Sequence, residues 1–264
     1  MVYRLLFVCS IIKLIGIFRL EDIMNVIRLE EVDSTNNYAK SHIADLEDRS
    51  VVHAIRQTNG RGRFDRTWVD LGPNNLFFTI ILKPCSEFSS VCPNITQYAC
   101  IILCRIFENY GINPKIKWPN DVMIEGKRKI SGILSESVIK NGQLEGLVVG
   151  IGVNLNSSQN DVDNIPDRVA TSLNLEIGNP VNMDAFLNEF LKEFFAHYDK
   201  FLHEGFDFIR NEYIKRSCFL NKDLHVQVLN EIKLGYAKDI TCDGELVLET
   251  ENSKDLVLTI GDIL

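Results

Sequence analysis

The feature that most constrains the fold is a pair of strand-like segments joined by an Asn-Gly dipeptide. Residues 131–139 and 144–156 have strand composition, and Asn141-Gly142 between them is a strong β-hairpin signal. The second segment contains LVVGIGVNL, which is nearly all apolar. Such a strand is typical of the centre of a sheet that is buried on both faces. The pattern therefore predicts a mixed α/β (α+β) fold with this strand at its centre.

Periodicity elsewhere in the chain predicts the elements that pack around this hairpin. Apolar runs of strand length differ from segments in which apolar residues recur every three or four positions, as they do on one face of a helix. The predicted elements are strands over 51–57 and 76–82, a short helix that Ser34 or Thr35 caps and that runs toward Leu46, helices over 95–107 (ending near Gly111) and 186–202, and a further helix ending near Arg216.

The two ends of the chain differ from this central part. From about Cys218 onward, short β-rich runs (224–229, 245–249 and 256–260) alternate with turn residues, and so few residues make a small independent core. We predict a catalytic domain over 24–217 and a small β-barrel-like domain over 218–264. Residues 1–23 contain an apolar stretch, 5–18, that is interrupted and is shorter than the roughly 20 residues needed to span a bilayer. We interpret them as a dispensable or mis-called extension before Met24.

Charge and cysteine content exclude several classes of function. The net charge is −8 and no block of Lys and Arg is large enough to hold a nucleic-acid backbone, so we predict no nucleic-acid partner. The seven cysteines include no C-x-x-C pair, which fits reduced thiols and a cytoplasmic location without membrane attachment. Cys100 and Cys104 lie on one predicted helix, and burial explains them better than metal binding because no second pair is nearby.

An arginine- and glycine-rich segment over residues 60–68 is the most informative sequence for function. Gly60 and Gly62 permit close backbone approach, while Arg61, Arg63 and Arg66 concentrate positive charge. Backbone N–H groups and guanidinium groups together can hold a phosphate or a carboxylate. The alternative from the residues alone is a solvated basic turn.

Three further positions carry candidate chemistry. The first is Lys117-Trp118-Pro119-Asn120-Asp121, in which the proline favours the end of a strand. At such a position, Asn120 and Asp121 can bind Mg²⁺ through their side-chain oxygens. The alternative is that Asn-Asp only forms a turn. Lys129 precedes Ser131-Gly132, where its cation could stabilise charge at a phosphorus centre unless it belongs to a surface charge run. Gly150 and Gly152 mark either glycine packing or a ligand close to the strand, and Asn154 offers the donor and acceptor that adenine requires.

Taken in chain order, these segments resemble the biotin–protein ligase family. The match covers nearly everything from Met24 to the C-terminus, and five ordered motifs are far more specific than any one of them. They are Ser34-Thr35-Asn36, the loop over 60–68, the KWPND sequence over 117–121, Lys129 to Gly132 and the G-x-G-x-N strand over 150–154.

The resemblance implies a fold, two half-reactions and a role for each matched residue. The expected architecture is a catalytic domain like that of class II aminoacyl-tRNA synthetases with an SH3-like C-terminal domain. Biotin attacks ATP to give biotinyl-5′-AMP, and the lysine of a biotin carboxyl carrier protein then displaces AMP. The implied biotin-binding residues are Ser34, Thr35, Asn36, Gln57, Gly60, Arg61, Gly62, Arg63, Lys129 and Gly132; the nucleotide-binding residues are Arg63, Arg66, Trp68, Asn120, Asp121, Lys129, Asn154 and Lys238; Asp121 serves Mg²⁺, and Lys129 and Arg63 are catalytic.

The sequence also departs from the family pattern. Asp65 replaces a glycine often found in the loop, and the residues before the first motif are too few for the helix-turn-helix domain of bifunctional members. We therefore expect a monofunctional biotin–[acetyl-CoA-carboxylase] ligase, which could form a homodimer. A lipoate–protein ligase is the closest alternative, but its R-R-x-S-G-G-type loop is missing. A non-catalytic biotin sensor is the other, although such a protein would need neither Lys129 nor the arginine loop.

Overall fold

The computed structural model describes residues 14–20, 24–64, 66–85, 88–166, 169–252 and 254–264. The larger of its two sheets has the strand order β1-β2-β3-β4-β8-β7-β6-β5. The bounds of these strands are Leu14–Leu20 (β1), Met24–Val32 (β2), Val51–Gln57 (β3), Leu76–Leu82 (β4), Pro114–Lys117 (β5), Asp121–Ile124 (β6), Arg128–Lys140 (β7) and Gln143–Val153 (β8).

Strands β4 and β8 lie next to each other near the middle of this sheet, as the apolar sequence of β8 predicted. The sheet is mixed, because β2 and β3 run parallel whereas the other described neighbours are antiparallel. Val149 packs into the core on one face, and the adjacent Val148 packs into a separate cluster on the other. Both faces of the central strands are therefore buried, and the predicted α/β class is confirmed.

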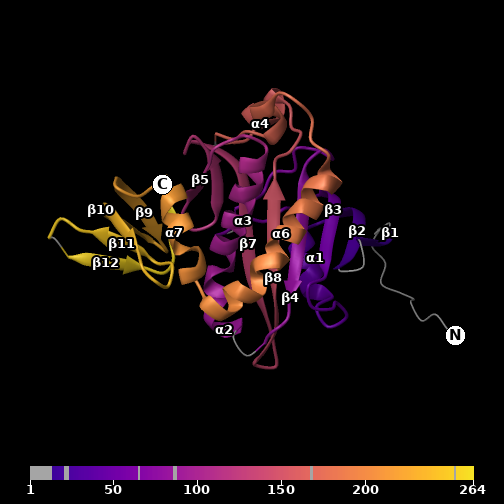
Figure 1. The fold of residues 1–264 in the computed structure, drawn as a ribbon, viewed down its shortest axis with the longest axis horizontal. Coiled ribbons are helices and arrows are strands. Elements are labelled where there is room, and N and C mark those ends of the chain that lie inside the picture. Colours follow the sequence, from indigo (N-terminus) through magenta and orange to yellow (C-terminus); the bar gives the residue numbers. More distant parts are fainter. Residues whose placement is uncertain (1–13, 21–23, 65, 86–87, 167–168, 253) are drawn as a thin grey trace.

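Helices cover the two faces of the larger sheet unequally. Their bounds are Thr35–Ser41 (α1), Phe88–Val91 (α2), Ile95–Asn109 (α3), Gln159–Asp163 (α4), Leu173–Ile177 (α5), Met183–Glu204 (α6) and Asp207–Arg216 (α7). Helices α3 and α6 lie side by side in front of the sheet in Figure 1, whereas α1 packs against the smaller apolar cluster on the opposite face. The buried face of α3 is what its helical periodicity predicted.

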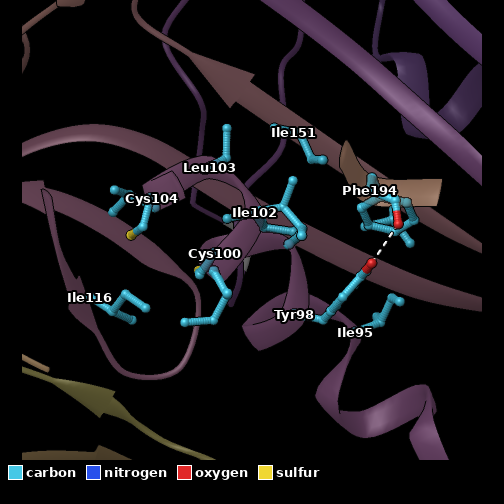
Figure 2. Packing of buried hydrophobic residues seen from close by; sticks show 14 of the residues in the cluster. Ile95, Tyr98, Cys100, Ile102, Leu103, Cys104, Ile116, Ile151 and Phe194 are labelled. Atoms are coloured by element: carbon cyan, nitrogen blue, oxygen red, sulfur yellow. Dashed lines mark hydrogen bonds between the residues drawn. The ribbon is translucent and has the colours of Figure 1, made fainter. Parts of the chain in front are cut away.

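The core between α3, α6 and the sheet contains both cysteines of α3. Figure 2 shows Cys100 and Cys104 among aliphatic side chains, with the Tyr98 hydroxyl donating a hydrogen bond to the Phe194 carbonyl. Burial raises the pKa of both thiols well above the ordinary value. These cysteines are core residues, as predicted, and the described residues contain no cluster of three or more potential metal ligands of the His, Cys, Asp or Glu type.

One detail of α1 was predicted incorrectly. Ser34 stands at the N-cap, but its side chain makes no capping hydrogen bond, and the helix ends at Ser41 rather than continuing toward Leu46. The residues after Ser41 form turns instead. The Ser34 side chain is also one of the groups that line a cavity, described below. A Ser-Thr pair before a helix is therefore not always a cap.

The C-terminal residues form a second, antiparallel sheet with the strand order β12-β11-β10-β9-β13. Its strands are Asp223–Val228 (β9), Glu231–Ile240 (β10), Leu246–Glu249 (β11), Asp255–Leu258 (β12) and Asp262–Ile263 (β13). Figure 1 shows this sheet in yellow beyond α7, which contacts both β5 and β10. Among the described strands no pairing joins β12 to β13, so the SH3-like barrel stays a prediction.

Part of the N-terminal segment is paired with the larger sheet. Strand β1 lies antiparallel to β2, at the edge of the sheet. The rest of the predicted extension, 1–13 and 21–23, lies outside the described residues, as does Asp65. Among the described helices, none combines the length and the apolar character needed to cross a membrane.

Candidate active site

Two adjoining cavities open where the arginine-rich loop meets β7 and β8. Trp68, Asp121 and Lys129 line both, so the cavities share a wall. The loop and Lys129, far apart in sequence, therefore face a common space. The residues predicted for the site that line the first cavity are Ser34, Thr35, Asn36, Gln57, Arg61, Gly62, Arg63, Arg66, Trp68, Asn120, Asp121, Lys129 and Gly132.

A hydrogen-bonded row of polar side chains lies at one end of the first cavity. The Thr35 backbone N–H donates to Gln57 Oε1 at 2.8 Å. Thr79 lies 2.8 Å from the Thr35 hydroxyl and 2.7 Å from Asn36 Oδ1. Buried polar groups must be paired, and this row pairs its members with one another, while Thr35, Asn36 and Gln57 also line the cavity. The strands β3 and β4 and helix α1 each contribute to it.

The glycines of β7 and β8 make room for side chains that reach across the sheet. A Cβ at Gly150 would collide with Asn36 Oδ1, and one at Gly152 would lie 2.5 Å from the Trp68 ring. A Cβ at Gly132 would lie 2.9 Å from the same ring. Glycine is therefore required here by the close approach of the Asn36 and Trp68 side chains, which favours the packing explanation over a ligand against the strand.

The loop over residues 60–68 is folded on itself by backbone hydrogen bonds. The N–H of Gly62 donates to Arg66 O at 2.7 Å, and that of Trp68 donates to Gly60 O at 3.0 Å. Arg63 Nη1 donates to Asn120 Oδ1 at 3.3 Å, which ties the loop to the turn between β5 and β6. Burial lowers the pKa of Arg63, although nearby carboxylates oppose the shift. An arginine still carries its charge at neutral pH, and in this partly desolvated place its attraction for an anion is strong.

Asp262 of β13 gives the loop arginines an acidic partner from the second sheet. It forms an ion pair with Arg66, and Arg63 Nη1 lies 3.9 Å from its Oδ1. Asp262 lines both cavities. No sequence signal distinguished it, because a single acidic residue close to the C-terminus belongs to no motif.

The position of Lys129 depends on an irregularity in β7. Ser131 pairs with Val122, but Lys129 pairs with Met123, so an extra residue bulges out of β7 between them. Lys129 Nζ lies 2.6 Å from Asp121 Oδ1 and 5.3 Å from the centre of the Trp68 ring. A bulge that turns a cation into a cavity is a common arrangement beside active sites.

The second cavity has a volume of about 630 Å³ and, like the first, is lined by several basic side chains. Asn154 lines it, and its Nδ2 donates to Thr171 O at 3.0 Å, so one of its donors is already engaged. Lys117 and Lys127 also line this cavity, together with Lys129. Lys117 stands in the KWPND motif, but its role at the cavity was not predicted. Clustered lysines over such a volume suit a polyanion.

Two predicted residues are not brought to the cavities. Gly60 packs against the other end of the loop, where a Cβ would lie 2.5 Å from Trp68 O. Lys238 is an exposed residue of β10 and lies 3.1 Å from Asp255 and 3.5 Å from Glu249, so its basic side chain is engaged within the second sheet. Lys238 stands at a register shift in the pairing of β10 with β11, between Ala237 and Asp239.

Sequence reasoning missed two polar residues that pair with side chains of the first cavity. Thr79 is fully buried, and Glu136 is paired with Lys40 and Arg61. Thr79 did carry a signal, because it is the one polar residue of the otherwise apolar strand β4. Glu136 carried none, since an acidic residue in an alternating strand usually faces solvent.

Comparison with known proteins places this geometry in a family. The model of the Biotin/lipoate A/B protein ligase family matches residues 29–154. The bifunctional ligase/repressor BirA of Bacillus subtilis is 31% identical over 202 residues, which cover 76% of this chain and 62% of BirA. The biotin–[acetyl-CoA-carboxylase] ligase of Paracoccus denitrificans is 28% identical over 237 residues, which cover 87% of this chain and 96% of that ligase. The chain thus spans about 62% of the length of the Bacillus relative.

The similarity extends to solved structures. The biotin protein ligase from Aquifex aeolicus in complex with biotin and ATP superposes with a TM-score of 0.74 at 25% identity, covering 90% of this chain and 97% of that one. The region matched by the family model contains all five motifs, the last of which ends at Asn154. The resemblance inferred from these motifs is confirmed, because residues 29–154 match the model of the biotin/lipoate A/B protein ligase family and the chain is similar over most of its length to biotin protein ligases.

Proposed function

We propose that this chain activates biotin with ATP and transfers it to a lysine of a biotin carboxyl carrier protein, as a biotin–[acetyl-CoA-carboxylase] ligase. The observation that carries the proposal is the shared wall of the two cavities, where Lys129, Trp68 and Asp121 meet. The polar row at Thr35 and Gln57 suits the ureido group of biotin, and the basic second cavity suits ATP. Biotin's carboxylate would then meet the α-phosphate beside Lys129.

In the first half-reaction, a biotin carboxylate oxygen attacks the α-phosphorus of ATP. A P–O bond forms to the carboxylate, the bond to the β-phosphate bridge breaks, and pyrophosphate leaves. Lys129 and Arg63 stabilise the negative charge on the α-phosphate as it passes through the transition state. They also reduce the repulsion between the carboxylate and ATP, which are both anionic.

In the second half-reaction, the acceptor lysine amine attacks the acyl carbon of biotinyl-5′-AMP. An amide C–N bond forms, the C–O bond to the phosphate breaks, the amine loses a proton, and AMP leaves. The folded loop over residues 60–68 covers the mixed anhydride in the meantime. Excluding water in this way favours aminolysis by the acceptor over hydrolysis.

The residues of the site fit an Mg²⁺ ion that enters with ATP. Asp121 Oδ1 is buried and receives no well-aligned hydrogen bond, although Lys129 lies close to it. Mg²⁺ is usually held by one or two carboxylates together with substrate phosphates, so a single aspartate suffices. Asp121 would hold the ion, which supplies charge neutralisation on the phosphates.

Incubating the protein with Mg·ATP, biotin and an apo carrier domain tests the proposal. We expect the carrier to gain the mass of one biotinyl group, with pyrophosphate released. Transfer of lipoate instead would indicate the lipoate ligase alternative, which the family name also covers. Tight biotin binding without adenylate formation would indicate a sensor, and either outcome would reject the proposal.

Several properties remain part of this proposal. They are the division into 24–217 and 218–264, an SH3-like second domain, and the possibility of a homodimer. A cytoplasmic location would also fit, because the described cysteines are free thiols and such proteins usually act in reducing compartments.

A further inference from the structure

Glu136 continues the cavity-facing row of β7 beyond the first cavity. Gly132 and Leu134 line that cavity, and side chains two residues apart on a strand share a face. Glu136, the next in this row, lines neither cavity, and its side chain is 20% exposed. It therefore lies behind the ligand site and can influence a ligand only through other side chains.

Three donors from separate parts of the chain converge on the Glu136 carboxylate. Oε1 accepts from Lys40 Nζ at 2.8 Å and from Arg61 Nη1 at 2.7 Å, and Oε2 accepts from Asn36 Nδ2 at 3.0 Å. Burial opposes ionisation, but the hydrogen bonds from Lys40 and Asn36 lower the pKa of Glu136 below its ordinary value. The residue is thus a carboxylate at neutral pH and forms charge-assisted bonds.

Two of these donors belong to residues that line the first cavity, Arg61 and Asn36. Within the described contacts, Arg61 uses only Nη1, which bonds Glu136 and Asn37 Oδ1. The rest of its guanidinium is left for a ligand carboxylate. Asn36 is fixed at both ends, because its Oδ1 also accepts from Thr79. Glu136 therefore ends the polar row that begins at Gln57.

We propose that Glu136 is a positioning residue that sets the affinity for biotin by orienting Arg61 and Asn36 at the first cavity. This inference rests on the proposed function. Lys40 serves as a second cation that keeps Glu136 charged and in place. The carboxylate touches neither substrate nor reacting atoms, so its loss should affect biotin binding far more than the chemical step.

Steady-state kinetics of Glu136→Gln, with separate KM values for biotin and ATP, test this role. The amide keeps the size of the side chain but cannot accept from all three donors. We expect the biotin KM to rise by about tenfold, in the range for a lost charge-assisted hydrogen bond, with kcat and the ATP KM changed by less than about twofold. Glu251→Gln is the control, since Glu251 is exposed in the turn after β11 and its substitution should leave all three values unchanged.

A double-mutant cycle with Arg61→Ala separates positioning from general destabilisation. In the Arg61→Ala background, Glu136→Gln should raise the biotin KM by clearly less than in wild type, because part of its effect acts through Arg61. Full additivity, an unchanged biotin KM, or a fall in kcat alone would overturn the inference while wild-type biotin transfer upholds the proposed function. A wild-type protein that neither binds nor transfers biotin would reject the proposed function and this inference together.

Discussion

Lys129 Nζ lies between Asp121 and the face of Trp68, and no other cation lines both cavities except Arg66 among the described residues. Lys129→Met keeps the aliphatic stem but removes the charge. We expect adenylate formation to slow by about 100- to 1,000-fold, equivalent to about 2.7–4 kcal/mol of lost transition-state stabilisation. Single-turnover pyrophosphate release measures this rate. Lys140→Met, at an exposed position of the same strand, should have no effect, and a loss below about tenfold for Lys129→Met would contradict the role.

His53 on β3 should make stability fall as the pH is lowered. Burial and the neighbouring Arg28 lower the pKa of His53 from 6.5 to about 4, although Asp184 opposes the shift. The unfolded chain therefore binds a proton before the folded one does, and stability decreases from pH 6.5 toward pH 4. Urea unfolding at pH 7 and pH 4.5 should show up to about 3 kcal/mol of this loss in wild type and less in His53→Gln. Equal pH dependence in the two proteins would contradict the assignment.

The residues of the site could be predicted where they belong to motifs, and not where they act through geometry. Arg63, Trp68 and Lys129 stand in dense motifs whose composition core packing does not explain. Glu136 and Asp262 become recognisable only when the fold brings Arg61 and Arg66 to them. Their partners lie far along the chain, and spacing in a single sequence carries no information about such pairs.

At the scale of elements, two of the three glycines of strand β8 make room for different side chains. Gly150 makes room for Asn36, and Gly152 makes room for Trp68. We expect Gly150→Ala to raise the biotin KM and leave Trp68 in place. Gly152→Ala should instead displace the Trp68 indole, giving a red shift in tryptophan emission and a higher ATP KM. The two variants control for each other, because both add one methyl group to the same strand; indistinguishable emission spectra would contradict the distinction.

Elements were predicted well where both faces of a strand are buried. The bounds of β3 and β4 agree with the predicted 51–57 and 76–82; β4 is buried along its whole length, whereas β3 is buried over its first four residues. Strand β10 was not predicted, since Gly235 and several charged residues interrupt it. The structure explains the glycine, because a Cβ at Gly235 would lie 2.8 Å from the Glu249 carbonyl of β11. Tertiary contact therefore overrides the local preference of glycine against strands.

At the scale of the whole molecule, the second sheet is anchored near the site by hydrogen bonds to its 241–244 turn. Trp118 Nε1 donates to Gly244 O at 3.2 Å, and Gln97 Nε2 donates to the same oxygen at 2.7 Å. Trp118 belongs to the KWPND motif, so one end of this motif supports the second sheet while Asp121 faces the cavities. The small sheet lacks a large core of its own, and such contacts fix where β13 places Asp262.

The Asp262 ion pair with Arg66 should therefore hold the arginine-rich loop in the ligand-free protein. Asp262→Asn removes the charge without changing the size of the side chain, and we expect trypsin to cleave after Arg61, Arg63 or Arg66 several-fold faster, because loop opening controls access. ATP should restore much of the protection, since its phosphates can replace the missing anion. Asp255→Asn is the matched control, because Asp255 lies in the same sheet but pairs with Lys238. Equal cleavage rates for wild type and Asp262→Asn would show that this ion pair does not hold the loop, which would then rest on its backbone hydrogen bonds and the Arg63–Asn120 contact.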